Sequence, residues 1–425
     1  MRKRIMSGVI FIAVFAFVSL VLSSPGAKRD KKDSLFKEVK LFSDTLSIID
    51  AEYVEEALAK SLIYGALRGM LASLDPHSQF LTPEEYNELK VDTEGKFGGI
   101  GIEITIKDGL LTVVTPIEDT PAWKAGIKTN DRIVKIDGNL TRDMTLSEAV
   151  GKLRGKAGEA VTVTMLRENE KKVLDFKIVR DIIKINDVKG VRILEDGIGY
   201  IRLVEFRENT DKNIDAALKS LKDKGMNALI LDLRNNPGGL LDVAIAVAER
   251  FIEKDKIIVS TKGRQRSANK EYFSRYKAPW VDLPVVVLIN EGSASGSEIV
   301  AAAFQDYRRG IILGMKSFGK GSVQAVFPLG DGSAVRLTTS RYFTPLGRQI
   351  HGKGVMPDIV VEEGRIEITN APSGVNQEAK EVFEQIEKKE NAVKADSGLK
   401  DYTTDNQLMR AVDVLKAVRI CRREK

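Results

Sequence analysis

The sequence predicts a mixed α/β fold with a β-rich domain inserted into it and a helical region before it. Apolar residues recur every three or four positions from Ser34 to about Lys90, which indicates helices. From about Gly95 to Val179 the spacing becomes two, which indicates short strands. From about Gly197 short apolar runs alternate with amphipathic stretches, a pattern typical of buried strands covered by helices on both faces.

The first 33 residues differ from the rest of the chain. Arg2, Lys3 and Arg4 precede a nearly unbroken apolar run from Met6 to Leu22. A basic segment followed by an apolar one is typical of an export signal, and cleavage after Ser23 fits it. The run is also close to the length of a spanning helix, so the sequence leaves open an uncleaved N-terminal membrane anchor. We therefore expect an exported protein.

Charge and composition exclude several classes of function. The formal charge is +6, but residues 1–33 alone hold seven Lys or Arg and two Asp or Glu. Little basic charge remains elsewhere for a phosphate-binding surface, so we expect no nucleic-acid partner. Cys421 is the only cysteine, and His77 and His351 are the only histidines. We therefore expect no disulfide, no metal and no cofactor.

A glycine-rich loop opens the β-rich stretch. Residues 98–102 read Gly-Gly-Ile-Gly-Ile, and consecutive backbone N–H groups in such a loop can hold a terminal carboxylate. Alone, the loop would indicate only a turn. Together with the segment 125–138 and a helical stretch at 146–153, in that order, it resembles a PDZ domain. The resemblance implies a peptide-binding site at Gly99, Ile100, Gly101 and Ile102.

A cluster of small residues follows the apolar run at 285–289. Ser293, Ser295 and Ser297 lie here, before an Ala-rich helix expected to start near Gly296. A serine at a strand-to-helix junction is exposed near the helix N-terminus, which suits a nucleophile. An ordinary N-cap is the alternative, and the residues alone do not decide among the three serines.

Lys320 lies between two glycines farther along the chain. A surface turn is the ordinary meaning of that pattern. The alternative is a general base, which requires burial and neighbouring charge to bring the pKa down from about 10.4 toward neutrality. Because histidine is scarce, a serine–lysine pair is the serine-hydrolase chemistry that this chain can best supply.

Several motifs in fixed order resemble one family, the carboxy-terminal processing (tail-specific) proteases. The resemblance runs from about Gly69 to Val361. Its segments are residues 73–78, the PDZ stretch, and residues 231–239, 293–298, 318–324, 342–348 and 352–358. A chance match of so many segments in one order is very improbable.

The resemblance assigns roles to residues of the two catalytic motifs. It implies that Ser295 is the nucleophile, Lys320 the general base and Gln324 the residue that orients the lysine. A contact between Gln324 and Lys320 needs a bend near Gly321, because four residues of straight strand span about 13 Å. Glu298, one helical turn after Ser295, receives a supporting role.

The resemblance also implies two oxyanion donors. One is the N–H of Gly296, and the other comes from the turn at residues 236–239. Gly238 is favoured and Gly239 stays open, whereas Pro237 has no N–H and is excluded.

The implied function is that of a serine endopeptidase with a ClpP/crotonase-like protease core. It would recognise the C-terminal tail of protein substrates through the PDZ domain and cleave near that end through an acyl-enzyme. Arg154 resembles a PDZ residue that couples tail binding to activation in some family members, and a solvated surface arginine is the alternative. The rival interpretations are a PDZ scaffold on an inactive protease fold, and an amidase or esterase that uses the same dyad.

The expected partners are proteins or peptides with exposed C-termini, and the sequence leaves open a homo-oligomer or an adaptor protein. The expected location is the bacterial periplasm or cell envelope, with the protein either soluble or tethered to the inner membrane. Five regions are expected: a leader with its linker (1–33), a helical region (34–94), the PDZ domain (95–180), the protease core (181–370, with a contribution from 34–94), and a charged, mostly helical C-terminal region (371–425).

Overall fold

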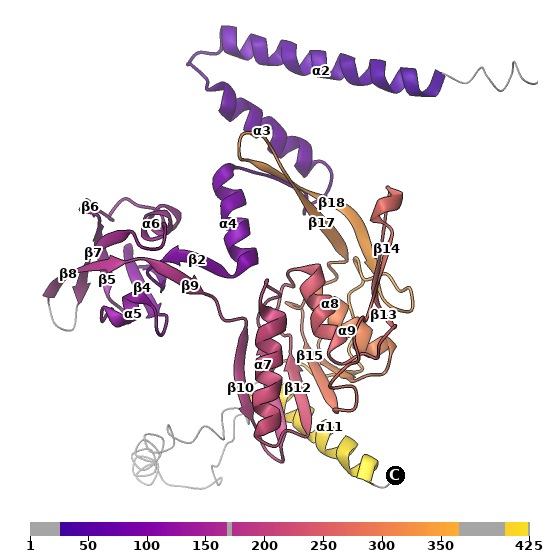
Figure 1. Ribbon diagram of the computed structural model, residues 1–425. Helices are drawn as coiled ribbons and strands as arrows, with labels where there is room; N and C mark the ends of the chain where they lie inside the picture. Colours follow the sequence, from indigo (N-terminus) through magenta and orange to yellow (C-terminus); the bar gives the residue numbers. More distant parts are fainter. Residues whose placement is uncertain (1–25, 168–171, 365–403, 424–425) are drawn as a thin grey trace, which may run out of the picture. The chain divides into compact units, whose positions relative to one another are not determined.

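A computed structural model describes residues 26–167, 172–364 and 404–423 (Figure 1). The expected export signal and most of the charged C-terminal region lie outside these residues. No helix in the described part of the chain is long and apolar enough to cross a membrane. The chain divides into two compact units, Met1–Thr82 and Pro83–Lys425.

The first unit is mainly helical. It contains α2 (Gly26–Glu52), α3 (Ala59–Ala72) and the short strand β1 (Gln79–Leu81). Between α3 and β1 the Asp75 carboxylate accepts hydrogen bonds from the N–H groups of His77 and Ser78, both at 2.8 Å. The aromatic rings of Tyr64 and Phe80 lie 4.6 Å apart and join α3 to β1. The helical character predicted for this region is therefore confirmed.

The second unit begins with α4 (Pro83–Glu94), which has proline at its first position and acidic residues in its first turn. A β-rich domain follows. It is entered and left through one antiparallel pair, β2 (Lys96–Gly99) and β9 (Asp181–Lys184). Between them lie β3 (Ile102–Lys107), β4 (Leu110–Pro116), α5 (Pro121–Lys124), β5 (Arg132–Ile136), β6 (Asn139–Leu140), α6 (Leu146–Leu153), β7 (Ala160–Arg167) and β8 (Lys172–Val179).

A six-stranded sheet forms the centre of the remaining α/β part (Figure 1). Its order is β10 (Val188–Ile193), β11 (Ile198–Leu203), β12 (Ala228–Asp232), β15 (Val285–Ile289), β16 (Ile311–Gly314) and β19 (Ile359–Val360). The first pair is antiparallel and the others are parallel. Four other strands pair antiparallel with one another. Their order is β17 (Ser322–Pro328), β18 (Ala334–Phe343), β13 (Ile257–Gly263) and β14 (Lys270–Phe273).

Helices cover both faces of the central sheet, as the continuous apolar strands predict. Leu229 and Leu231 of β12 pack in a cluster with residues of α7 (Thr210–Asp223), α8 (Leu241–Glu249) and α9 (Gly296–Asp306). The alternate residues, Ala228 and Ile230, pack with residues of α11 (Asn406–Arg423) on the other face. This mixed α/β arrangement places the ends of β12 and β15 beside the start of α9.

The packing of α11 predicts a measurable loss of stability when a buried side chain of this helix is shortened to alanine. Leu415 is 1% exposed and belongs to the cluster on the second face of the sheet. We expect Leu415→Ala to lower the free energy of unfolding by about 2–4 kcal/mol, because it leaves a cavity. Ile420 on the same helix is 63% exposed, so Ile420→Ala should change it by less than about 0.5 kcal/mol. Urea denaturation compares the two, and equal losses would contradict the prediction.

Candidate active site

Ser295 lies in the turn between β15 and α9, with a backbone conformation that a serine rarely adopts. Its φ is 51° and its ψ is −110°. Such strain is typical of functional residues. A Cβ on Gly238 would lie only 2.7 Å from the Cβ of Ser295, so the backbone of Gly238 is in direct contact with it.

The structure distinguishes the three neighbouring serines. The Ser293 hydroxyl donates to the carbonyl of Leu233 at 2.8 Å and accepts the N–H of Asn290 at 2.9 Å. The Ser297 hydroxyl donates to the carbonyl of Asn236 at 2.9 Å. Both are fully buried, so these two serines join neighbouring segments of the fold. Ser295 alone of the three combines the strained backbone with residual exposure, 8%.

The Glu298 carboxylate joins the turn that contains Ser295 to the loop that contains Lys320. One oxygen, Oε2, accepts both the N–H of Ser295 and the N–H of Lys320 at 2.9 Å. The other oxygen accepts the hydroxyl of Ser317 at 2.5 Å and the N–H of Gly319 at 2.8 Å. Burial raises the pKa of Glu298, and these hydrogen bonds act in the opposite direction. The two segments are thus held against one buried carboxylate.

Lys320 is half-buried in this loop, just before β17. Burial lowers the pKa of its ammonium group, the positive charge of Arg336 lowers it further, and Glu298 acts in the opposite direction. No described residue forms a hydrogen bond or ion pair with its Nζ. A lowered pKa increases the neutral fraction of the amine, which is the form that can accept a proton.

Gln324 lies on β17, four residues after Lys320. Its Nε2 donates to the hydroxyl of Ser322 at 2.8 Å. The strand β17 has a pairing irregularity between Val323 and Gln324, later than the bend expected near Gly321. Among the described residues no hydrogen bond joins Gln324 to Lys320. The orienting role implied for Gln324 therefore stays a prediction.

The turn at 236–239 lies against the start of α9 and contains the two candidate oxyanion glycines. The N–H of Gly238 donates to the side-chain oxygen of Asn236 at 2.9 Å. Phe206 donates its N–H to the carbonyl of Gly238, and Leu240 donates to the carbonyl of Phe206, both at 2.8 Å. In this parallel bridge the N–H of Gly239 points away from Phe206.

Gly296 is the first residue of α9, so its N–H has no acceptor within the helix. It also lies at the positive end of the α9 helix dipole. The structure therefore brings Ser295, Gly296 and the Gly238–Gly239 turn together at one place.

Sequence reasoning missed the side chains that hold this turn. Asn290 accepts the N–H of Asn235 at 2.8 Å, and its amide donates to the side chain of Asn235 at 3.0 Å. Arg234 donates to both Asp232 and Asp405, at 2.7 Å each. The motif at residues 231–239 contains three of these residues, but Asp405 is 171 positions from Arg234, and no local pattern indicates that pair.

A small apolar cavity of about 160 Å³ marks the expected peptide-binding site of the β-rich domain. Its lining includes the expected Gly99, Ile100, Gly101, Ile102 and Arg154, together with Phe97, Ile104, Leu146, Val150 and Leu153. Gly101 has a φ of 81°, and a Cβ there would lie 2.3 Å from Thr120, so glycine is required. The Arg154 guanidinium lies 4.6 Å from the centre of the Phe97 ring, and both residues line the cavity.

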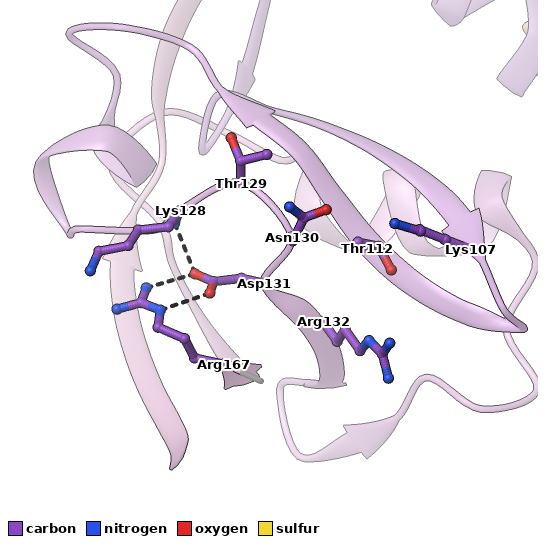
Figure 2. Close-up of a pocket in the computed structure, with 8 residues that line it drawn as sticks. All are labelled: Lys107, Thr112, Lys128, Thr129, Asn130, Asp131, Arg132 and Arg167. Carbon is purple, nitrogen blue, oxygen red and sulfur yellow. Dashed lines mark hydrogen bonds and ion pairs between the residues drawn. The ribbon is translucent and has the colours of Figure 1, made fainter. Parts of the chain in front are cut away.

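A second, polar cavity of about 300 Å³ lies elsewhere on this domain (Figure 2). Arg167 donates to Asp131 through Nε and Nη2 at 2.8 and 2.7 Å, and the N–H of Lys128 donates to the same carboxylate. Arg167 also donates to the carbonyl of Gly126. These bonds join the end of β7 to the loop before β5, which gives the ion pair a structural role.

Within the described residues, no group of three or more His, Cys, Asp or Glu side chains is arranged to hold a metal ion. The site described above consists of hydroxyl, amine, carboxylate and backbone N–H groups. These groups suffice for acyl transfer by a serine with a lysine as base.

Comparisons with known proteins identify two domains in this chain. Residues 197–361 match peptidase family S41, and residues 98–178 match a PDZ domain. The carboxy-terminal-processing protease of Bartonella bacilliformis is 45% identical over 360 residues, which cover 84% of this chain and 82% of that protein. The carboxy-terminal processing protease CtpA of Bacillus subtilis is 36% identical over 341 residues, or 80% and 70% of the two chains.

A solved structure of a photosystem II D1 C-terminal processing protease is 31% identical. It covers 76% of this chain and 92% of its own, with a TM-score of 0.44.

The four hydrogen bonds to Glu298 predict the effect of neutralising it. In Glu298→Gln one oxygen becomes an NH₂ group that faces N–H donors, so we expect the free energy of unfolding to fall by about 1–3 kcal/mol. We also expect proteolysis to weaken, because the Ser295 and Lys320 segments lose a shared acceptor. Glu148→Gln is the control, since Glu148 accepts a backbone N–H at an exposed helix cap. Urea denaturation that ranks Glu148→Gln as the more damaging change would refute the argument.

Proposed function

Because this chain belongs to peptidase family S41, among the carboxy-terminal processing proteases, we propose that it is an endopeptidase that cuts near the C-terminus with a Ser295–Lys320 dyad. As a member of that family it is a serine peptidase with a PDZ domain. The observation that carries the proposal is the shared acceptor. One oxygen of Glu298 holds the backbone N–H groups of both Ser295 and Lys320.

The reaction follows from the chemistry of these groups. Neutral Lys320 accepts the hydroxyl proton of Ser295 as its Oγ attacks the carbonyl carbon of the scissile peptide bond. The tetrahedral intermediate then breaks its C–N bond, and Lys320 returns the proton to the leaving amine. The C-terminal fragment departs and leaves an ester on Ser295. Water hydrolyses that ester, with Lys320 again accepting a proton, and the free hydroxyl is restored.

The oxyanion of the intermediate needs two N–H donors close to Ser295. Gly296 supplies one, because its N–H has no helical acceptor. For the second, Gly238 and Gly239 both remain candidates. The Gly238 N–H is bound to Asn236 in this state, so its use requires that bond to open. The Gly239 N–H points away from Phe206 and needs no such change.

The PDZ domain supports recognition of a substrate tail. Its cavity of about 160 Å³ is lined mainly by aliphatic side chains, and the loop at residues 98–102 borders it. A free carboxylate can bind the N–H groups of that loop while an aliphatic terminal side chain enters the cavity. The proposed substrates are therefore proteins with an exposed, apolar C-terminus.

Export to the periplasm or cell envelope remains part of the proposal on sequence grounds. It is supported by the three basic residues at positions 2–4 and the apolar run behind them. Mass spectrometry of the N-terminus of the protein made in cells tests it, because a signal peptidase would remove the run.

Proteolysis by the full chain tests the dyad and the tail together. We expect Ser295→Ala and Lys320→Ala to reduce cleavage of an unfolded protein by roughly 10⁴-fold or more, because no other group replaces either function. Ser297→Ala is the control that leaves the nucleophile in place. Amidation of the substrate's C-terminus should raise KM by removing the bound carboxylate. Cleavage that persists in Ser295→Ala with a normal circular dichroism spectrum would overturn the assignment.

The pH dependence tests Lys320 as the base. The amine must be neutral to accept a proton, so the rate rises with pH as the ammonium deprotonates. Since burial and Arg336 lower the pKa of Lys320, this rise lies below the ordinary lysine value of about 10.4. Removing the positive charge in Arg336→Met raises the pKa of Lys320 and moves the rise to higher pH. Initial rates across the alkaline range measure it. Arg341→Met, on the same strand, should overlay the wild type, and an identical curve for Arg336→Met would disprove the mechanism.

A further inference from the structure

Arg207 lies where both connections of the PDZ domain meet the protease core. Its side chain is 12% exposed, and its guanidinium donates hydrogen bonds to three acceptors. Nε donates to the carbonyl of Asp92, at the end of α4 and before the PDZ domain, at 2.9 Å. Nη1 donates to the carboxylate of Asp187, which follows the PDZ domain, and Nη2 donates to that of Glu205 after β11.

The two PDZ connections are also joined to each other at this place. The N–H of Ile185 donates to the carbonyl of Gly95 at 2.8 Å, next to the β2–β9 pair. The hydroxyl of Thr210 donates to the second oxygen of Asp187 at 2.8 Å. Gly95 has a φ of 67°, and a Cβ there would lie 2.9 Å from Cδ of Arg207. The Arg207 side chain therefore packs directly on the entry segment.

The residue before Arg207 holds the proposed oxyanion turn. Phe206 is 1% exposed, and its backbone exchanges hydrogen bonds with Gly238 and Leu240, both at 2.8 Å. A Cβ on Gly239 would lie 2.2 Å from the carbonyl oxygen of Phe206. The Phe206 ring lies 3.0 Å from the position of a Cβ on Gly296. Phe206 thus contacts both sides of the proposed oxyanion site.

We propose that Arg207 is a positioning residue. Its hydrogen bonds to acceptors on both PDZ connections fix the position of Phe206. Phe206 in turn fixes Gly238, Gly239 and Gly296. The inference rests on the proposed function, because it concerns the oxyanion donors of that reaction. A displacement of either connection changes the acceptors of Arg207 and therefore the position of the turn. The PDZ domain and the oxyanion site share one anchor.

The geometry requires arginine and not merely a positive charge. A guanidinium has donors on three nitrogens in a fixed plane, whereas a lysine ammonium is one point at the end of a flexible chain. Lysine at this position can keep the charge between Asp187 and Glu205, but it cannot reach all three acceptors at once. Arg207→Lys therefore changes geometry while it conserves charge.

The first test compares Arg207→Lys with Arg250→Lys in the full chain. Arg250 is similarly half-buried and pairs with Asp215 between α7 and α8, and none of its described contacts is with Phe206. We expect Arg207→Lys to lower kcat per titrated active site by roughly 10- to 100-fold. The affinity for a fluorescent tail peptide, measured by anisotropy, should stay unchanged. Counting active sites separates slow chemistry from a misfolded fraction.

The second test perturbs Arg207 by a substitution in the segment that enters the PDZ domain. Gly95→Ala places a methyl group against Arg207, whereas Gly109→Ala introduces a similar backbone strain, at a φ of 74°, with no atom within 4 Å. We expect a fall in kcat for Gly95→Ala only. Unchanged kcat per active site in both Arg207→Lys and Gly95→Ala would overturn the inference, as would equal losses in the two controls.

A fluorophosphonate probe distinguishes this failure from failure of the proposed function. If Ser295→Ala is labelled as fast as wild type, the proposed nucleophile is wrong. If Ser295→Ala is inert while the Arg207 and Gly95 variants react and turn over normally, only the positioning role of Arg207 is refuted.

Discussion

The arrangement of the active site depends on one buried carboxylate, that of Glu298. Its burial is costly unless donors surround it, and hydrogen bonds to a charged group are worth about 1.5–3 kcal/mol each. Its four donors come from the Ser295 turn and from residues 317–320. If either segment moved away, the Glu298 carboxylate would lose hydrogen-bond donors that the other segment does not replace. The two stretches are also joined directly, because the N–H of Phe318 donates to the carbonyl of Ser293 at 3.0 Å, and the carboxylate adds four hydrogen bonds to that contact.

Hydrogen bonds from several segments explain how unusual backbone conformations are tolerated at this site. Ser295 has a strained φ of 51°, whereas Gly238 and Gly239 adopt positive values, 103° and 136°, that glycine permits. Strained residues persist only when surrounding contacts over-determine them. The 235–239 turn is held from three directions, by Asn290, by Phe206 and, through Arg234, by Asp405. The last of these bonds makes the C-terminal helix part of the support, although it lies on the opposite face of the sheet from α9.

The sequence allowed the elements of the site to be predicted, but not their contacts. The apolar run at 285–289 followed by small residues indicates the strand-to-helix turn, because strand length and helix onset are local properties. The choice among three serines is not local, since the hydroxyls of Ser293 and Ser297 bind residues 60 and 61 positions away. The hydrogen-bond partner of Gln324 could not be predicted either, because β17 has a pairing irregularity between Val323 and Gln324 that no local pattern indicates.

The position at which the PDZ domain is inserted has a mechanical consequence. Its entry and exit strands pair with each other, so the domain is attached to the core through one two-stranded connection and not two independent linkers. A paired connection transmits displacement, because its strands cannot move separately without losing hydrogen bonds. The segments that flank it meet the core beside Arg207, one residue from the backbone that holds Gly238. A domain attached elsewhere on the core could bind the same tail. Attached here, its orientation and the geometry of the oxyanion turn are coupled by the covalent path of the chain.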